Sequence, residues 1–351
     1  MANILILGAG MMGSALAYPL CDRGHTVRLG GTPLDDSIVE QVRKDSTHPK
    51  LGLRLPEGVV AFRHTELFEA AQGVDAIALG VSSAGIDWAS TILPSLLRPG
   101  LPLFMITKGL VLENGALRTL PDVVRGRLPE ALRSTVAPCA IAGPCIAGEL
   151  ARRVPTCVVL AGHDTAALEV IGALIETPYY RLFPTTDVIG AEVSAALKNA
   201  YAMGIAFAAG KNERAGNTAG SIAMHNLESA IMAQAVVEMS RIADKLGGAR
   251  NTVTSLAGVG DLDVTTNGGR TGKFGRFLGM GLSRDEAIVK MEGATLECLE
   301  ILAVMREALN GGSVPKTTLA DVPLLDHLIH VALDGAPADP PIHKFFGRGT
   351  L

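Results

Sequence analysis

The chain has 351 residues, of which 48% are hydrophobic and 19% charged, and its 31 basic and 35 acidic side chains give a formal net charge of −4. This composition is typical of a globular protein of about two domains and excludes a disordered chain. The charge balance gives no overall attraction to nucleic acid or to an anionic membrane, and the 4% of aromatic residues provide little base-stacking surface. A phosphorylated ligand would need a local cluster of Lys, Arg and backbone N–H groups.

The cysteines and the apolar segments bear on the compartment. None of the five cysteines forms a Cys-x-x-Cys pair, which argues against a zinc site or a disulfide framework and favours a reducing compartment. The N-terminal MANILILGAG has no basic region and only a short apolar run, so we expect no signal peptide. The later apolar stretch Ala200–Gly210 is too short to span a bilayer. We expect a cytoplasmic protein without a bound metal.

The first half of the chain alternates short apolar runs with helical patterns. The runs are Asn3–Leu7, Thr26–Leu29, Ala76–Val81, Leu103–Ile106, Val136–Ala142 and Thr156–Leu160, and clear helical patterns are Ser14–Arg23, Ser37–Lys44 and Ala166–Ile175. Near-continuous apolar runs separated by helices predict parallel strands that are covered on both faces. We therefore predict an α/β domain with a Rossmann-type doubly wound sheet over residues 1–188.

From Val188 onward the chain has no clear strand runs. Helical patterns cover Ile189–Ala209 and Ser221–Leu246, and Ser283-x-x-Glu286 is a capping box that starts a further helix. Gly311 and Gly312 are expected to end the next one. We predict an all-helical C-terminal domain over residues 189–351, with the segment from Gly335 as a tail.

A glycine motif, Gly8-Ala9-Gly10-Met11-Met12-Gly13, lies between the first strand and the first helix. Alone it is weak evidence, since a chain with 40 glycines contains this spacing by chance about half a time. In this context, however, Gly8 suits the tight turn, Gly10 lets the backbone approach a pyrophosphate, and Gly13 allows close helix–strand packing. The alternative is a glycine-rich turn without a ligand; we predict a dinucleotide site.

The end of the second strand bears on the choice between NAD and NADP. NAD enzymes usually place a carboxylate there to bind the ribose. No carboxylate lies within Gly30–Thr32, and Asp35 and Asp36 come later, while the Thr32 hydroxyl can donate to a 2′-phosphate. We expect NADP or NAD as cofactor, with NADP favoured.

A lone lysine interrupts the apolar helix of the second half. Between Glu192 and Lys211 the only charged residue is Lys198, which Asn199 follows. Small and apolar neighbours would desolvate the ammonium and favour its neutral form, which suits a proton donor near neutral pH. The alternative is a structural lysine whose stem packs in an interface while its head reaches water.

Three further segments carry polar groups at places where ligands bind. Lys108 follows the strand ending at Ile106, at the sheet edge where α/β proteins bind ligands. The segment Gly143–Glu149 can offer N–H groups to an anion, and the glycine-rich loop expected over Gly258–Gly272 holds Asp, Thr and Arg that can cradle a phosphate. The alternatives are a solvated lysine, a plain turn and a flexible surface loop.

Taken together, these segments resemble the NAD(P)-dependent sn-glycerol-3-phosphate dehydrogenase family over about Ile4 to Leu309. The shared landmarks are GAGMMGSAL at Gly8, VSS at Val81, TKGL at Thr107, GPCIAGEL at Gly143, ALKN at Ala196, GVGDLDVT at Gly258, Gly269-Arg270 and Met291-Glu292-Gly293. His48-Pro49-Lys50-Leu51-Gly52 and the Gly-Gly-Arg spacing look like an archaeal-type branch.

The resemblance implies reduction of dihydroxyacetone phosphate to sn-glycerol 3-phosphate by NAD(P)H, and the reverse, as a supply of phospholipid backbones. By position, Lys198 would be the general acid/base, and Lys108 and Asp261 would complete the catalytic group. The substrate would contact Asn199, Thr265, Gly269, Arg270, Thr271, Gly143 and Cys145. The cofactor would contact Gly8, Gly10, Met11, Met12, Gly13, Thr32, Val81, Ser82, Lys108, Ala147, Arg270 and Glu292. A homodimer is compatible with the sequence, which leaves the oligomeric state open.

The chain departs from the family pattern in three places. Thr271 replaces the usual asparagine after arginine, Gly148 replaces a frequent long side chain, and Met11-Met12 replaces a polar or aromatic pair. One alternative function is a 3-hydroxyacid or 6-phosphogluconate-type dehydrogenase, but those enzymes typically carry Lys-x-x-x-Asn, whereas Asn199 is adjacent to Lys198. Another is a non-catalytic NADP-binding sensor, which has no need for Lys108, Lys198, Asp261 and Arg270 together.

Overall fold

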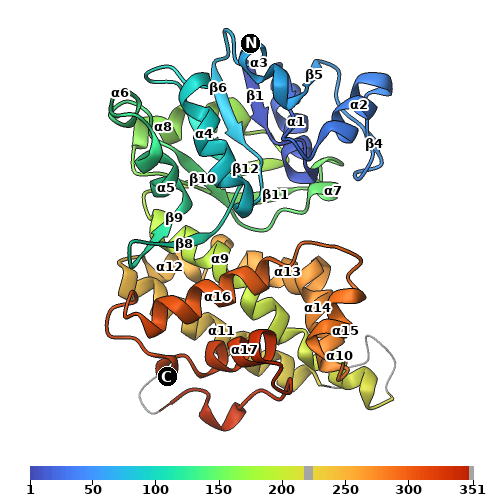
Figure 1. Cartoon of the computed structure of the whole chain (residues 1–351), viewed down its shortest axis with the longest axis vertical. Coiled ribbons are helices and arrows are strands. Elements are labelled where there is room, and N and C mark those ends of the chain that lie inside the picture. Colours follow the sequence, from blue (N-terminus) through green and yellow to red (C-terminus); the bar gives the residue numbers. More distant parts are fainter. Residues whose placement is uncertain (217–223, 348–351) are drawn as a thin grey trace. The chain divides into compact units, whose positions relative to one another are not determined.

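The computed structural model describes residues 1–216 and 224–347 and divides into two compact units (Figure 1). The first unit comprises Met1–Lys108 and Thr119–Val188, and the second comprises Gly109–Arg118 and Ile189–Leu351. The expected fold class is confirmed, since an α/β unit with a doubly wound sheet precedes a helical one. No helix in the described part of the chain has the apolar run that a bilayer-spanning segment requires.

An eight-stranded sheet forms the centre of the first unit, in the order β12-β11-β10-β7-β6-β1-β2-β5. Its strands are β1 (Asn3–Leu7), β2 (Thr26–Gly30), β5 (Val59–Phe62), β6 (Ala76–Leu79), β7 (Leu103–Met105), β10 (Cys139–Ala142), β11 (Thr156–Ala161) and β12 (Tyr180–Thr185). The main helices around it are α1 (Met11–Asp22), α2 (Asp36–Asp45), α4 (Ile86–Leu96), α5 (Leu120–Arg127) and α8 (Thr165–Ile175). The six expected strands and three expected helices are all present.

Two features of this sheet differ from the prediction. The sheet is not wholly parallel, because β10 and β11 are antiparallel. The helix between them, α7 (Ala147–Leu150), is about 6 Å long and does not carry the chain back across the sheet. The edge strands β5 and β12 were missed because exposed and buried residues are interleaved along them, with Val60 and Phe183 facing solvent.

The second unit is built from helices. They are α9 (Val188–Ile205), α10 (Phe207–Arg214), α11 (His225–Leu246), α12 (Arg250–Val253), a π-helical turn (Leu256–Gly260), α13 (Asp261–Gly268), α14 (Arg270–Gly279), α15 (Arg284–Val289), α16 (Glu297–Asn310) and α17 (Pro323–Asp334). The helix expected over 189–209 is divided at Ala206, and residues 221–223 of the one expected over 221–246 lie outside the described residues. The capping box at Ser283 is present, and α16 ends before Gly311.

Two segments of the second unit correct the sequence prediction. Residues 109–118, expected within the first domain, carry a hairpin of β8 (Leu110–Glu113) and β9 (Ala116–Thr119). A two-residue turn with positive φ, Asn114-Gly115, joins its strands, and Leu110 packs in the helical core. The expected tail is also packed, since Phe345 is buried and the Phe346 N–H donates to Gln234 Oε1 at 3.1 Å; residues 348–351 lie outside the described residues.

Glycines bring the helices of the second unit into close backbone contact. A Cβ atom on Gly275 would lie 2.1 Å from the Met203 carbonyl oxygen, and one on Gly279 would lie 2.4 Å from that of Phe207. Backbones can approach this closely only where side chains are absent. The glycine-rich segment 258–272, expected to be a phosphate-cradling loop, is instead helical almost throughout, and the glycines that follow it serve the packing of α14 against α9 and α10.

A buried carboxylate fixes the position of α9 within the second unit. Glu238 on α11 accepts hydrogen bonds from the Tyr201 hydroxyl at 3.0 Å, Gln234 Nε2 at 2.7 Å, and the N–H groups of Leu324 and Leu325 at 2.8 and 2.9 Å. Burial raises the pKa of Glu238, and these donors oppose that rise. Because every bond joins a buried group, the network fixes α9 and the start of α17 against α11.

Candidate active site

The lysine on α9 is largely buried and forms an ion pair. The side chain of Lys198 is 11% exposed, and its Nζ donates to Oδ1 of Asp261, whose side chain is 2% exposed. A carboxylate in contact with a buried ammonium offsets the cost of removing that charge from water. The structure therefore supplies Lys198 with a partner that holds it in place.

A π-helical turn precedes Asp261 and sets its position. A Cβ atom on Gly258, within this turn, would lie 1.9 Å from the carbonyl oxygen of Val253. Only glycine fits there, and single π-helical turns are common at functional sites. Asp261 is the first residue of α13, where the helix dipole favours a negative charge.

Asn199 and Arg270 share a second carboxylate in the same unit. Asn199 Nδ2 donates to Glu297 Oε2 at 3.2 Å, and Arg270 Nη2 lies 3.5 Å from Glu297 Oε1. The side chain of Arg270 is 55% exposed, so its guanidinium is open to a ligand. Glu297 is a residue that the sequence analysis missed, because no motif links the start of α16 to Asn199.

The remaining predicted residues of the second unit lie in different surroundings. Gly269 precedes α14, and its N–H donates to the Thr265 carbonyl oxygen at 3.1 Å. Thr271 is buried and shares a hydrogen bond with the Cys298 thiol, so it does not join the group of Arg270 and Asn199. Glu292 is exposed in the connection between α15 and α16, with a left-handed backbone at φ 52°.

The three glycines of the loop in the first unit differ in the space around them: two are tightly packed and one is open. Gly8 has φ +114°, and a Cβ atom there would lie 2.7 Å from Gly80; one on Gly13 would lie 2.2 Å from the Gly8 carbonyl oxygen. A Cβ atom on Gly10 would meet nothing within 4 Å. Gly8 and Gly13 are therefore needed by the fold, whereas Gly10 leaves free space at the start of α1. That space fits a pyrophosphate held by the first N–H groups of the helix.

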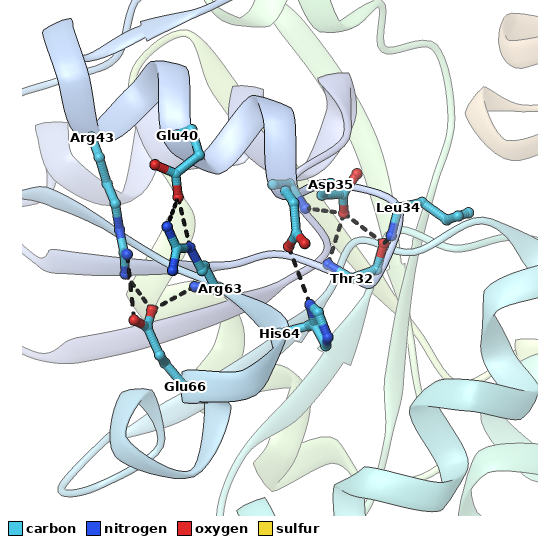
Figure 2. A network of polar contacts seen from close by, with 10 residues as sticks. Thr32, Leu34, Asp35, Glu40, Arg43, Arg63, His64 and Glu66 are labelled. Carbon is cyan, nitrogen blue, oxygen red and sulfur yellow. Dashed lines mark hydrogen bonds and ion pairs between the residues drawn. The ribbon is translucent and has the colours of Figure 1, made fainter.

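A carboxylate does lie at the end of β2, although none occurs within Gly30–Thr32 (Figure 2). Oδ2 of Asp35 accepts hydrogen bonds from the Thr32 hydroxyl at 2.8 Å, the Thr32 N–H at 2.9 Å and the Ala9 N–H at 3.2 Å. The turn before α2 thus returns Asp35 to the strand end and to the glycine loop. The Thr32 hydroxyl, expected to donate to a 2′-phosphate, donates to Asp35 instead.

Further ion pairs join α2 to the segment after β5, as Figure 2 shows. Arg63 Nε donates to Glu40 Oε1 at 2.7 Å, Arg43 pairs with Glu66, and His64 Nδ1 lies 3.1 Å from Asp36 Oδ1. The two arginines lie near the strand end, but each already contacts a carboxylate.

The loops after β6, β7 and β10 are also joined within the first unit. Lys108 Nζ donates to the Gly143 carbonyl oxygen at 3.3 Å, and the Thr107 hydroxyl donates to that of Val81 at 2.7 Å. Ser82 precedes a short 3₁₀ helix in the same loop as Val81. Cys145 is half-buried, and Ala147 is buried at the start of α7. The predicted residues of this unit thus lie on adjoining loops at one sheet edge.

Comparison with known proteins gives matches along both units. The N-terminal model of the NAD-dependent glycerol-3-phosphate dehydrogenase family matches residues 3–168, and the C-terminal model matches residues 187–342. The NADP(+)-dependent glycerol-3-phosphate dehydrogenase of Archaeoglobus fulgidus is 37% identical over 333 residues, which cover 95% of each chain. A glycerol-3-phosphate dehydrogenase [NAD(P)+] of Geobacter metallireducens is 30% identical over 99% of this chain and 97% of the relative.

Solved structures match the fold along its whole length. The glycerol-3-phosphate dehydrogenase of Coxiella burnetii superposes with a TM-score of 0.81 and 26% identity, covering 98% of both chains. The enzyme of Plasmodium falciparum superposes with a TM-score of 0.83 at 17% identity, covering 99% of this chain and 96% of that one, which shows a shared fold.

Proposed function

Because the chain belongs to the NAD-dependent glycerol-3-phosphate dehydrogenase family, we propose which of its residues carry that family's reaction. The chain is an oxidoreductase that acts on a CH–OH group with NAD(P), interconverting dihydroxyacetone phosphate and sn-glycerol 3-phosphate. The single observation that carries the assignment of roles is the buried Lys198–Asp261 pair. Asn199, the residue after Lys198, contacts the same carboxylate, Glu297, as Arg270 does.

Lys198 is the general acid in the direction of reduction. The bound nicotinamide supplies or accepts the hydride at C2 of the substrate. As the C2 oxygen gains negative charge, Lys198 Nζ gives it a proton, and in the reverse direction Nζ takes that proton back. Asp261 contacts Nζ and thereby orients it, while the low exposure of the pair keeps water from replacing either group.

Arg270 binds the substrate phosphate, and Asn199 orients the substrate. A guanidinium can hold a phosphate through two parallel N–H···O bonds, and the side chain of Arg270 is exposed enough for a phosphate to reach it. The roles of Lys108, Thr265, Gly269, Gly143 and Cys145 at the substrate, and of Val81, Ser82, Ala147 and Glu292 at the cofactor, stay predictions. For Thr271, burial beside Cys298 argues against direct contact.

Arg270→Ala tests the phosphate site. We expect KM for dihydroxyacetone phosphate to rise by about 10²-fold, since charge-assisted bidentate contacts contribute about 1.5–3 kcal/mol or more. KM for unphosphorylated dihydroxyacetone should change little. Steady-state kinetics with both substrates give the comparison, and equal changes in the two KM values would remove Arg270 from the phosphate site.

The first unit holds the dinucleotide through the glycine loop at Gly8, Gly10 and Gly13, with Met11 and Met12 at the start of α1. We propose NADPH as the favoured form, supported by the lack of a carboxylate directly within Gly30–Thr32 and by the NADP(+)-dependent relative. Asp35 opposes this preference, because its carboxylate lies against Thr32, where the 2′-phosphate would come.

Asp35→Asn should raise the preference for NADPH over NADH by about tenfold. The substitution removes the negative charge of Asp35 beside the Thr32 hydroxyl and so removes repulsion of the 2′-phosphate. A tenfold change in preference corresponds to about 1.4 kcal/mol. The ratio of kcat/KM for the two cofactors measures the effect, with Asp36→Asn as control because Asp36 faces His64 instead. A ratio that stays constant or moves toward NADH would show that Asp35 does not act on the 2′-phosphate.

The cellular setting is a further part of the proposal. We propose that the chain acts in the cytoplasm and supplies glycerol backbones for phospholipids, as a homodimer. The reducing compartment is supported by the sequence, in which none of the five cysteines forms a Cys-x-x-Cys pair. Size-exclusion chromatography with light scattering checks the dimer.

A further inference from the structure

Glu297 lies at the point where the substrate-binding side chains of the second unit meet. It is the first residue of α16, and its two carboxylate oxygens contact different partners: Oε2 accepts from Asn199 Nδ2 at 3.2 Å, and Oε1 lies 3.5 Å from Arg270 Nη2. Glu297 is only partly buried, with its side chain 39% exposed. The roles assigned above do not include it.

The carboxylate occupies the place on Arg270 that an anionic ligand would take. A carboxylate and a phosphate offer similar oxygens to a guanidinium, so both cannot use the same N–H group at full strength. A phosphate bound to Arg270 beside Glu297 would also place like charges close together, and their repulsion opposes binding. Binding therefore requires Glu297 to release Arg270 or to tolerate the repulsion.

Release of Glu297 is energetically accessible. More than half of the Arg270 side chain is exposed, and exposed ion pairs contribute little to stability. After release, the carboxylate remains in the first turn of α16, where the helix dipole favours negative charge. The contact is thus strong enough to orient Arg270 and Asn199 but weak enough for a substrate to displace.

We propose that Glu297 is a specificity-determining residue that holds Arg270 and Asn199 in the free enzyme and competes with the phosphate of the substrate. This proposal rests on the assignment of Arg270 to the phosphate. It assigns Glu297 no part in the chemical step: the residue sets the affinity for phosphate-bearing ligands. Only ligands whose phosphate binds Arg270 more strongly than the carboxylate does will displace it.

Glu297→Gln tests the competition, with Glu307→Gln as the matched control. Glu307 lies on the same helix, is exposed, and loses the same charge. The probe is inorganic phosphate, measured as a competitive inhibitor against dihydroxyacetone phosphate. We expect the Ki of phosphate to fall by about threefold to tenfold in Glu297→Gln, with a parallel fall in KM, whereas Glu307→Gln leaves both unchanged. A structural role alone would lower the melting temperature without improving phosphate binding.

Measurements in the Arg270→Ala background distinguish the role of Arg270 at the phosphate from the competition by Glu297. If Arg270 carries the phosphate, Arg270→Ala weakens phosphate inhibition, and adding Glu297→Gln then has no further effect. A Ki that is unchanged or higher in Glu297→Gln, while Arg270→Ala still weakens inhibition, overturns the inference about Glu297 and leaves the proposed function intact. If Arg270→Ala leaves phosphate inhibition unchanged, both are overturned.

Discussion

Lys198→Ala is expected to lower kcat by about 10²-fold or more, because a positioned acid contributes about 10²–10⁴-fold to a proton-transfer step. Hydride delivery to the ketone carbon leaves negative charge on the C2 oxygen, and no proton donor would then remain at the position of Nζ. The loss should appear in kcat and not only in KM. Cofactor affinity should be nearly unchanged, since the glycine loop belongs to the other compact unit.

The ion pair makes a second variant necessary. Lys198→Ala leaves the nearly fully buried Asp261 carboxylate without its ammonium, and breaking a buried pair in this way can cost about 3–5 kcal/mol. Combining Lys198→Ala with Asp261→Asn removes the buried negative charge as well and protects the fold. Lys211→Ala is the control, because Lys211 on α10 also pairs with an aspartate, Asp339. A folded variant without Lys198 that binds NADPH and retains most of its kcat would rule out Lys198 as the acid.

Alanine at Gly10 should weaken cofactor binding without affecting stability, whereas alanine at Gly13 should lower stability. Gly10→Ala should leave the melting temperature unchanged, because the new Cβ meets no protein atom, but it should raise the NADPH dissociation constant by about tenfold or more. Gly13→Ala should lower the free energy of unfolding by about 1–3 kcal/mol, since its Cβ would lie 2.2 Å from the Gly8 carbonyl oxygen.

NADPH fluorescence titration and thermal unfolding of the two variants measure these effects. The two glycines are three residues apart in one loop, so each variant serves as the control for the other. If Gly10→Ala bound NADPH as tightly as the wild type, the open space at Gly10 would not be the pyrophosphate position.

The centre of the sheet could be predicted from the sequence, whereas its edges could not. β1 (Asn3–Leu7) is buried on both faces, so its run of apolar residues is continuous and its bounds match the expectation. β12 (Tyr180–Thr185) has one exposed face, and the pattern breaks at Arg181 and Phe183. Strand direction was missed at β10–β11 because burial is the same for parallel and antiparallel neighbours.

The candidate site was predictable where its residues share a local motif. The glycine loop and the lone Lys198 stand out in short segments. Lys198 and Asp261 are 63 residues apart, and both could be singled out from the sequence because each lies in a recognisable motif. Asp35 was passed over because a turn returns it to the strand end. Glu297 lies 98 residues from Asn199 and has no motif of its own, so its contact required the packing of α16 against α9.

Absorbance of NADPH during incubation with dihydroxyacetone phosphate is the most direct test of the proposed reaction. Parallel reactions contain unphosphorylated dihydroxyacetone or a 3-oxoacid, and the oxidative direction is followed with sn-glycerol 3-phosphate or 6-phosphogluconate and NADP⁺. We expect rapid loss of NADPH with dihydroxyacetone phosphate, sn-glycerol 3-phosphate as the product, and at least tenfold lower kcat/KM for the other substrates in each direction. Turnover of the 3-oxoacid or of 6-phosphogluconate, with none of dihydroxyacetone phosphate, would contradict the assignment.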